Sequence, residues 1–175
     1  IMESIINSSI VHHLERHKLI SDRQYGFRRK RCTGDLLCLL LHSCSKSLDN
    51  FGESRVVALD IAQAFDRVLH KALLSKLSNF GLSLKLINWI QHFLLKRTIA
   101  VRVDGGLSES MSVNAGVPQG CILSPTLFIM FINDLLESTH NPIHSYADDS
   151  TLHGSFSFSK CPTKSQLQSH IDALK

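Results

Sequence analysis

Two adjacent carboxylates lie between short apolar runs in the segment Ile143-His-Ser-Tyr146-Ala-Asp148-Asp149-Ser-Thr-Leu152. Asp is unfavourable inside strands and favourable in tight turns, so the pattern predicts a β-hairpin with both acids at its bend. A plain turn more often uses Asn-Gly or Asp-Gly, because two neighbouring negative charges repel each other. A divalent cation would remove that repulsion, since Mg²⁺ takes hard oxygen ligands. The segment therefore indicates a metal site, and a solvated acidic turn is the alternative.

A third carboxylate ends a predicted strand far away in the sequence. Residues Arg55 to Ile61 form a β-branched run that includes Asp60, the pattern of a buried central strand with an acid at its end. If this strand lies beside the acidic hairpin, Asp60 meets Asp148 and Asp149. Two Mg²⁺ ions that clamp the attacking and leaving oxygens of a phosphoryl transfer need carboxylates from separate segments in this way. A single Mg²⁺ site or a hydrolase would fit the same acids equally well.

The rest of the chain is predicted to be mostly helical. Apolar residues recur at helical spacing over residues 2–17, 33–50, 69–80, 83–96 and 124–135, and another helix begins at Lys164. Leu69 is expected on the buried face of its helix, and Gly52 and Gly81 are expected as helix stops. A hairpin is predicted over 98–113 and a polar loop over 155–162. This order predicts the α+β class, with an antiparallel sheet and helices packed on one of its faces.

Composition places the chain among folded globular proteins. It has 175 residues, 43% of them hydrophobic and 19% charged, which is enough for one domain with a core. The net charge of +4 is compatible with nucleic acid but too small to indicate it. Five Cys without a C-x-x-C pair fit a reducing compartment, and Cys38 with His42 lacks the second ligand pair that zinc needs. The apolar runs are shorter than the ~18 residues of a membrane span, so no transmembrane helix is expected.

Two polar segments stand out from this background. In Ala115-Gly116-Val-Pro118-Gln119-Gly120, two Gly residues around Pro-Gln imply that the backbone approaches another group closely. A turn that only starts a helix would explain the Pro and the Gly residues but not Gln119. In Ser21 to Arg31, Tyr25 and Phe27 stand beside four consecutive cations. Basic charge interleaved with aromatic rings suits a phosphate backbone and stacked bases, and a solvated cationic loop is the alternative.

These segments together resemble a known family. Asp60-Ile-Ala-Gln-Ala-Phe65-Asp66, Gly116-Val-Pro-Gln-Gly120 and Tyr146-Ala-Asp-Asp149, in this order and at these intervals, resemble the three central palm motifs of reverse transcriptases. Gln24-Tyr-Gly-Phe-Arg28 resembles the preceding segment of the non-LTR (LINE-type, jockey-like) retrotransposon branch. The resemblance covers nearly the whole chain. It implies an α+β polymerase palm over residues 55–175 and partial fingers over residues 1–54.

The resemblance also implies the chemistry of the acids. Asp60 and Asp148 match the residues that bind both metal ions, with the Ile61 carbonyl helping and Asp149 supporting. The ions are expected to be Mg²⁺, with Mn²⁺ as a substitute. The implied reaction is attack by a primer 3′-hydroxyl on the α-phosphate of a dNTP, with release of pyrophosphate and with RNA as the template.

Further positions match substrate-binding residues of the family. Phe65 matches the side chain beneath the incoming sugar, and Tyr146 with Ala147 matches the pair beside the primer end. Gln119 and Gly120 match residues that line the nucleotide and template pocket. The last of these expected contacts comes from the cationic segment, where Arg28 would bind the nucleic-acid backbone.

The resemblance implies partners beyond the chain itself. RNA template, DNA primer and dNTPs are expected, together with the rest of a retrotransposon polyprotein, which would supply the endonuclease and thumb; no membrane is expected. The location implied is intracellular, in nucleus and cytoplasm. Both ends of the chain lie within predicted helices, and the family's fingers strands and thumb would lie outside it. The chain alone is therefore expected to be an inactive piece of a polymerase. Leu69 stands where the family commonly has Trp, which costs only packing.

Two other functions remain open on the sequence. One is a non-catalytic nucleic-acid-binding relic, in which the palm survives but the acids no longer work on metals. The other is a metal phosphatase or nuclease built on the paired acids, for which His144 or His153 could act as a base. The second alternative leaves the Gly-Val-Pro-Gln-Gly segment unexplained.

Overall fold

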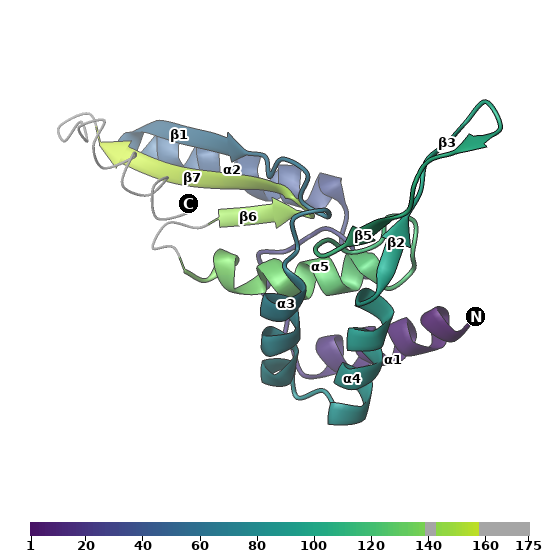
Figure 1. Cartoon of the computed structure of the whole chain (residues 1–175). Helices are drawn as coiled ribbons and strands as arrows, with labels where there is room; N and C mark the ends of the chain where they lie inside the picture. Colours follow the sequence, from purple (N-terminus) through teal and green to yellow (C-terminus); the bar gives the residue numbers. More distant parts are fainter. Residues whose placement is uncertain (139–142, 158–175) are drawn as a thin grey trace. The chain divides into compact units, whose positions relative to one another are not determined.

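The computed structural model of the chain describes residues 1–138 and 143–157 (Figure 1). Its residues form two compact units, each assembled from two separate segments. The first unit combines Ile1–Leu19 with Gln63–Phe131, and the second combines Ile20–Ala62 with the residues from Ile132 onward. The expected division into partial fingers over 1–54 and palm over 55–175 concerns roles in a polymerase, and it stays a prediction.

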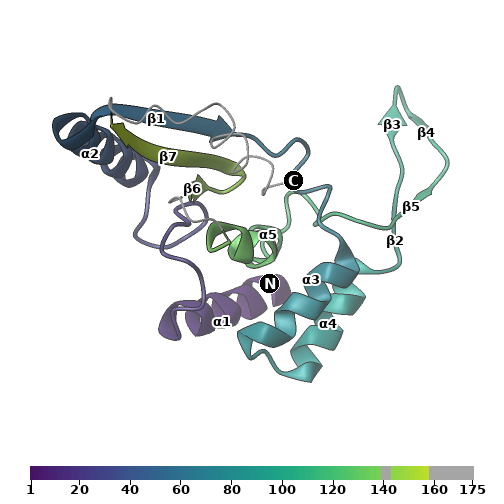
Figure 2. The same cartoon turned by 90° about the vertical axis from the view of Figure 1, so that its left-hand side faces the viewer.

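Helices dominate the first unit. They are α1 (Met2–Arg16), α3 (His70–Leu77), η1 (Ser78–Phe80), α4 (Leu84–Leu94) and α5 (Ser124–Ile132). Figure 2 shows α1, α3 and α4 gathered below α5. Their apolar faces meet in a core of fully buried side chains that includes Ile10, Leu14, Leu73, Leu77, Ile90, Leu94, Leu127 and Phe128. Burial of these faces stabilises the helices far more than their local propensity does.

Local signals fix where these helices begin and end. The Ser83 hydroxyl accepts a hydrogen bond from the Leu86 N–H at 3.4 Å and so caps α4. Gly81 ends η1 with φ of 69°, a conformation that glycine adopts without strain. Leu69 differs from the expectation, because it precedes α3 as its cap residue and is 60% exposed. Its backbone instead forms a β-bridge with Ala115.

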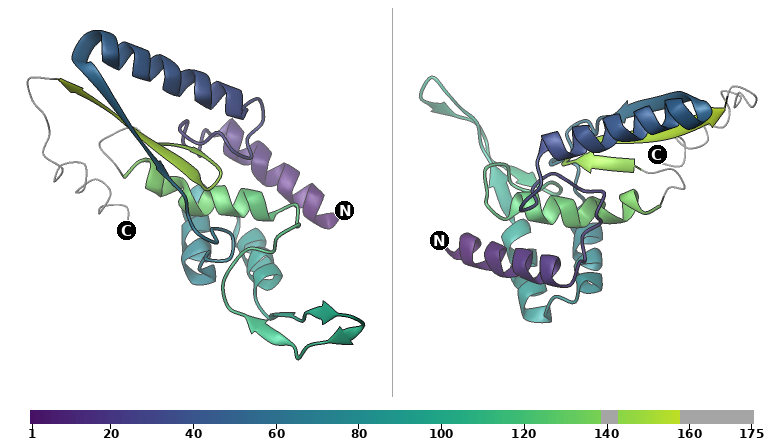
Figure 3. Two further views of the ribbon diagram at one scale, coloured as in Figure 1. Left: turned by 90° about the horizontal axis from the view of Figure 1, so that it is seen from above. Right: turned by 180° about the vertical axis from the view of Figure 1, so that it is seen from behind.

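The predicted hairpin over 98–113 is confirmed. β2 (Arg97–Ile99) pairs with β5 (Met111–Val113), and β3 (Arg102–Val103) pairs with β4 (Gly106–Leu107), both antiparallel. The turn residues Asp104 and Gly105 have φ of 47° and 85°, the positive values that a two-residue hairpin turn favours. Figure 3 shows this hairpin projecting away from the helices of its unit.

The second unit is a three-stranded antiparallel sheet with a helix along one face. The strands are β1 (Gly52–Leu59), β6 (Ile143–Tyr146) and β7 (Asp149–Ser157), in the order β1-β7-β6. α2 (Thr33–Phe51) lies along the sheet (Figure 1), and η2 (Asn133–Leu136) precedes β6. Side chains alternate between the faces of a strand, so an apolar cluster forms on the face away from α2. It consists of Leu136, Ile143 and Leu152, with Val57 and Leu59 packed against it.

Two strand predictions need correction. The β-branched run was expected as a buried central strand, but β1 lies at the edge of the described sheet and Val56 is 48% exposed. β7 takes the central place because the tight turn pairs it with β6 while its other edge pairs with β1. Residues Ser155–Ser157 belong to β7 and not to a loop, because pairing with Gly52–Ser54 satisfies their backbone groups. The remainder of the expected loop and the helix from Lys164 lie outside the described residues.

The predicted α+β class is confirmed by this arrangement of helices and antiparallel strands. Among the described residues, no helix is long and apolar enough to cross a bilayer.

Candidate active site

Strand register brings the acids to one end of the sheet. The last pair between β1 and β7 joins Leu59 to Ser150, so the next residues along these strands are Asp60 and Asp149. Asp149 also pairs with Tyr146 across the hairpin, and Asp148 lies in the turn between them. Asp60 and Asp149 are exposed, and Asp148 is half-buried. Asp60 and Asp149 are therefore solvated and do not carry the cost of burial.

The register does not by itself make a ligand cluster. Within residues 1–138 and 143–157, no three His, Cys, Asp or Glu side chains come together closely enough to hold a metal ion. Strand pairing places Asp60 and Asp149 at one end of the sheet, with Asp148 in the adjoining turn. Their metal-binding role stays a prediction.

The turn that carries Asp148 has a strained backbone. Ala147, its first residue, has φ of 59° and is buried at 6% exposure. A left-handed conformation costs a residue with a Cβ about 1–2 kcal/mol. The predicted hairpin is confirmed with Asp148 in its turn, but Asp149 begins β7 instead of lying at the bend. The sequence also did not predict that an alanine would take this conformation. Such strain persists only where surrounding contacts hold the backbone in place.

Gln24 supplies those contacts, and sequence reasoning missed it as a site residue. Its amide oxygen accepts the N–H of Ala147 at 3.0 Å, and its amide nitrogen donates to the Ala147 carbonyl at 3.3 Å. The side chain is only 1% exposed. The single available signal was its place in the Gln24-to-Arg28 motif, which gives no indication of a partner 123 residues away.

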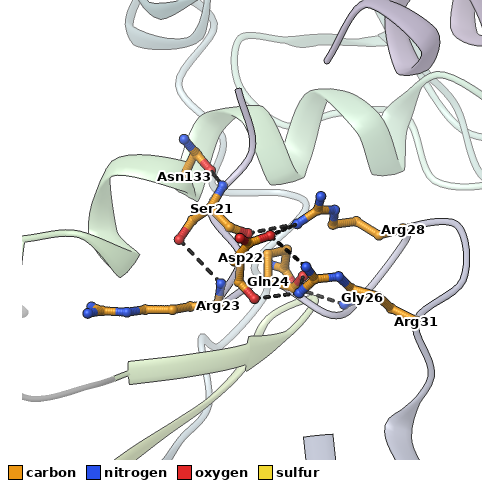
Figure 4. A network of polar contacts seen from close by, with 8 residues as sticks. All are labelled: Ser21, Asp22, Arg23, Gln24, Gly26, Arg28, Arg31 and Asn133. Carbon is orange, nitrogen blue, oxygen red and sulfur yellow. Dashed lines mark hydrogen bonds and ion pairs between the residues drawn. The ribbon is translucent and has the colours of Figure 1, made fainter. Parts of the chain in front are cut away.

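The cationic segment folds back on itself. Figure 4 shows Arg28 and Arg31 turned toward neighbouring backbone and acid groups. Arg28 donates to the Ser21 carbonyl at 2.9 Å, and its side chain is 7% exposed. Arg31 forms an ion pair with Asp22 at 2.6 Å and lies over the Tyr25 ring at 5.0 Å from its centroid. The expected contact between Arg28 and nucleic acid stays a prediction, and the exposed Arg29 and Lys30 offer more accessible charge.

The second motif forms a compact arrangement in the first unit. The Gly116 N–H donates to Val68 at 2.8 Å, and the Val117 N–H donates to the Phe65 carbonyl at 2.9 Å. Gly116 has φ of 90°, and a Cβ there would lie 3.0 Å from the Asp66 backbone. The predicted close backbone approach is confirmed for Gly116, whereas a Cβ at Gly120 would meet nothing within 4 Å.

Side chains complete the same arrangement. Gln119 is exposed, and its amide donates to the Asp66 carboxylate at 3.2 Å. Gly120 is exposed as well. His70 is buried and hydrogen-bonds the Gly116 carbonyl at 2.7 Å. Phe65 is half-buried and stacks on Phe128, with ring centroids 4.7 Å apart and planes 13° from parallel.

Comparison with known proteins decides the family. Residues 2–175 match the family described as reverse transcriptase (RNA-dependent DNA polymerase). The chain belongs to the reverse transcriptase family. Membership of this family argues against the alternative of a metal phosphatase or nuclease. That alternative needed a histidine such as His153 as a base, but His153 has a structural role. Its imidazole hydrogen-bonds the Ser54 hydroxyl at 3.0 Å and the Ser47 hydroxyl at 3.3 Å, and so joins the sheet to α2.

Curated relatives of this reverse transcriptase come from mobile elements. The RNA-directed DNA polymerase from mobile element jockey of Drosophila melanogaster is 35% identical over the whole chain, and that of Drosophila funebris is 32% identical over 99% of it. The probable polymerase from transposon X-element of Drosophila melanogaster is 31% identical over 77% of the chain. These matches confirm the jockey-like branch. The chain spans 20% of the length of the jockey relatives and 15% of the X-element one.

Solved structures confirm the fold of the reverse transcriptase palm. The apo telomerase of Candida tropicalis superposes with a TM-score of 0.70 at 13% identity, and covers 97% of this chain and 33% of its own. The telomerase of the same organism in complex with a fragment of telomeric RNA gives a TM-score of 0.69 at 14% identity, over 97% of this chain and 30% of its own. At such identities the likeness concerns the fold alone.

Proposed function

We propose that the chain is the palm, with part of the fingers, of an RNA-directed DNA polymerase that extends a DNA primer along an RNA template. Family membership supports the proposed reaction. The proposed site rests on the strand register, because the pair Leu59 and Ser150 is followed by Asp60 on one strand and preceded by Asp149 on the other. The chain spans a fifth of the length of its jockey relatives, so the rest of the fingers, the thumb and the endonuclease would belong to the longer polyprotein. We also propose that the polymerase acts inside the cell, in the nucleus and the cytoplasm.

Divalent metal ions fit the donors at this end of the sheet. Asp60 and Asp148 would bind two Mg²⁺ ions, or Mn²⁺, with the Ile61 carbonyl helping and Asp149 supporting. Carboxylate and carbonyl oxygens are the hard ligands that these ions prefer. Two such ions, when bound, stabilise charge on the attacking and leaving oxygens of an in-line displacement. The chain contributes by strand pairing, which holds acids from two distant segments at one end of a sheet.

The remaining motif residues are proposed to bind substrates. Tyr146 and Ala147 precede the acids and would lie beside the primer end. In the first unit, the exposed Gln119 and Gly120 would bind the nucleotide and template, and Phe65 would contact the sugar of the dNTP. Arg28 would act on the nucleic-acid backbone, where cations dominate the affinity.

The proposal is tested by primer extension on an RNA template, with a longer protein that contains residues 1–175 and with its Asp148→Asn variant. The substitution keeps the shape of the side chain but removes the charge that holds Mg²⁺. Synthesis should fall by about 10³-fold or more, while the dissociation constant for an RNA–DNA duplex should change by less than about threefold.

Two outcomes would contradict the proposal. Equal loss of binding and synthesis would make Asp148 a structural residue. Absence of metal-dependent extension by the unchanged longer protein would favour the non-catalytic relic, in which the palm only binds nucleic acid.

A further inference from the structure

A short extended segment runs beside the hairpin that carries the acids. The Ser145 N–H donates to the Arg23 carbonyl at 2.9 Å, and the Tyr25 N–H donates to the Ser145 carbonyl at 2.7 Å. These bonds form a parallel bridge between Gln24 and Ser145. Residues 23–25 thus act as a short extra strand next to β6, within the same unit.

The end of this segment fits directly against the turn. The Gln24 amide oxygen accepts N–H groups from both Gly26, at 2.8 Å, and Ala147, at 3.0 Å. Its amide nitrogen donates to the Ala147 carbonyl at 3.3 Å. One buried side chain therefore satisfies the peptide groups on both sides of Ala147, which restrains the two backbone dihedrals of that residue.

Gly26 is required by the same close approach. A Cβ at position 26 would lie 2.1 Å from the Ala147 nitrogen, 2.8 Å from its Cα and 2.9 Å from the Tyr146 carbonyl carbon. Real Cβ atoms do not approach backbone this closely, and backbone atoms cannot turn aside as a flexible side chain can. Any larger residue at position 26 must displace the turn or the segment.

The segment is anchored on the side away from the turn. Arg23 donates to the Leu136 carbonyl at 2.7 Å, and the Ser21 N–H donates to the Asn133 side chain at 2.8 Å. Figure 4 shows the contact between Ser21 and Asn133, with Arg23 and Gln24 beside it. Because the segment is fixed to η2 as well as to β6, a larger residue at position 26 would displace the turn and not the segment.

We propose that Gln24 and Gly26 are positioning residues that hold Ala147 in its left-handed conformation and thereby aim the Asp148 carboxylate. The inference rests on the proposed role of Asp148 as a metal ligand. Asp148 directly follows Ala147, so a rotation of the Ala147 backbone changes the direction in which the Asp148 carboxylate points. Metal-dependent steps are sensitive to displacements of about 1 Å in their ligands.

The test uses a longer protein that contains residues 1–175 and extends a primer on RNA. Gly26→Ala introduces the clash, Gln24→Met keeps the length of the side chain without its hydrogen bonds, and Gly34→Ala is the matched control. A Cβ at Gly34 meets only the Cys32 sulfur, at 3.5 Å, an ordinary contact. The burst amplitude of the first turnover counts active molecules, so kcat is expressed per active site.

We expect kcat per active site to fall by about 30-fold or more in Gly26→Ala and Gln24→Met, with KM for dNTP within about threefold. The Mg²⁺ concentration for half-maximal rate should rise by about fivefold or more, and Gly34→Ala should leave all three quantities within about twofold. A merely structural role predicts a lower melting temperature and a smaller burst, with kcat per active site unchanged. That result would overturn the inference.

Amide hydrogen exchange distinguishes failure of this inference from failure of the proposed function. Because it is measured on Gln24→Met, it also tests the inference if Gly26→Ala does not fold. Exchange at the Ala147 N–H should accelerate by about tenfold or more in Gln24→Met, since this group loses its acceptor. Unchanged exchange overturns the positioning role. If exchange accelerates in Gln24→Met but Asp148→Asn retains full synthesis, Gln24 does restrain Ala147 but the proposed function is rejected. The proposed orientation of Asp148 for metal binding is then rejected as well.

Discussion

Phe65 illustrates how one residue can have both a packing role and a proposed substrate role. Its ring stacks on Phe128 inside the first unit, and the side chain is half-buried. If the ring serves only the core, its truncation would lower the stability of the protein and leave substrate selection unchanged. A ring that lies against the sugar of a bound nucleotide would also exclude a 2′-hydroxyl while accepting a 2′-hydrogen.

Phe65→Val separates these roles. In an active longer protein, the use of rNTP relative to dNTP should rise by about tenfold or more, equivalent to about 1.4 kcal/mol, if the ring excludes ribose. Competing the two substrates in one extension assay measures the ratio. Phe80→Val, in the same unit and 9% exposed, is the control for lost packing. An unchanged ratio, with stability lower by about 2–4 kcal/mol in both variants, would leave Phe65 as core only.

His144 makes the stability of the second unit dependent on pH. Burial lowers the pKa of this imidazole below its ordinary value, and the charges of Arg23 and His153 lower it further. In the unfolded chain the imidazole takes up its proton near pH 6.5, whereas in the fold it does so at lower pH. Its contribution to stability is therefore complete above pH 6.5 and is lost as the pH falls through the folded pKa.

We expect the free energy of unfolding to fall between about pH 7.5 and about pH 5, and to fall less in His144→Gln. Urea titrations at both pH values measure the difference. His12→Gln, which changes an exposed histidine of α1, should keep the full pH dependence. An identical dependence in His144→Gln and in the unchanged protein would contradict the assignment.

At the scale of elements, α2 is attached to the sheet by a small polar cluster. The Ser47 hydroxyl lies 2.6 Å from the Ser155 hydroxyl and 3.3 Å from the His153 imidazole, and Ser47 is 3% exposed. Ser47→Ala removes one hydrogen-bond partner from the buried His153 imidazole and one from the exposed Ser155 hydroxyl, at a cost of about 1–2 kcal/mol. The midpoint of urea unfolding measures the loss, and Ser75→Ala, at an exposed serine of α3, should change it little. Equal midpoints for the two variants would contradict the role of this cluster.

The elements also show which features a sequence can predict. Helix ends at Gly81 and Ser83, and the hairpin turn at Asp104, depend on neighbours within a few residues, so their patterns are sufficient. The place of β1 at a sheet edge depends on strands about a hundred residues later, and a β-branched run alone cannot indicate it. The contact between Gln24 and Ala147 spans 123 residues, and local patterning contains no trace of it. The hairpin around Asp148 was predictable because Asp between two short apolar runs is itself a local turn signal.

At the scale of the whole molecule, the two units are interleaved in the sequence. The chain completes neither unit before it enters the other, since residues 20–62 of the second unit lie between the two segments of the first. A piece that ends before β7 would leave the sheet without its central strand and separate Asp60 from Asp148. This arrangement explains why the motif residues are dispersed along the chain and why no single short segment holds the site.

Pairing between β1 and β7 delays folding while the chain is being made. Ser54 and His153, which hydrogen-bond across these strands, are 99 residues apart. At translation rates of about 5–20 residues per second, β1 leaves the ribosome roughly 5–20 s before its partner. During that interval the backbone groups of β1, together with Val57 and Leu59, lack the sheet that covers them, and unpaired strands of this kind aggregate. A chaperone that shields β1 on the ribosome until β7 has emerged would therefore limit aggregation of this chain.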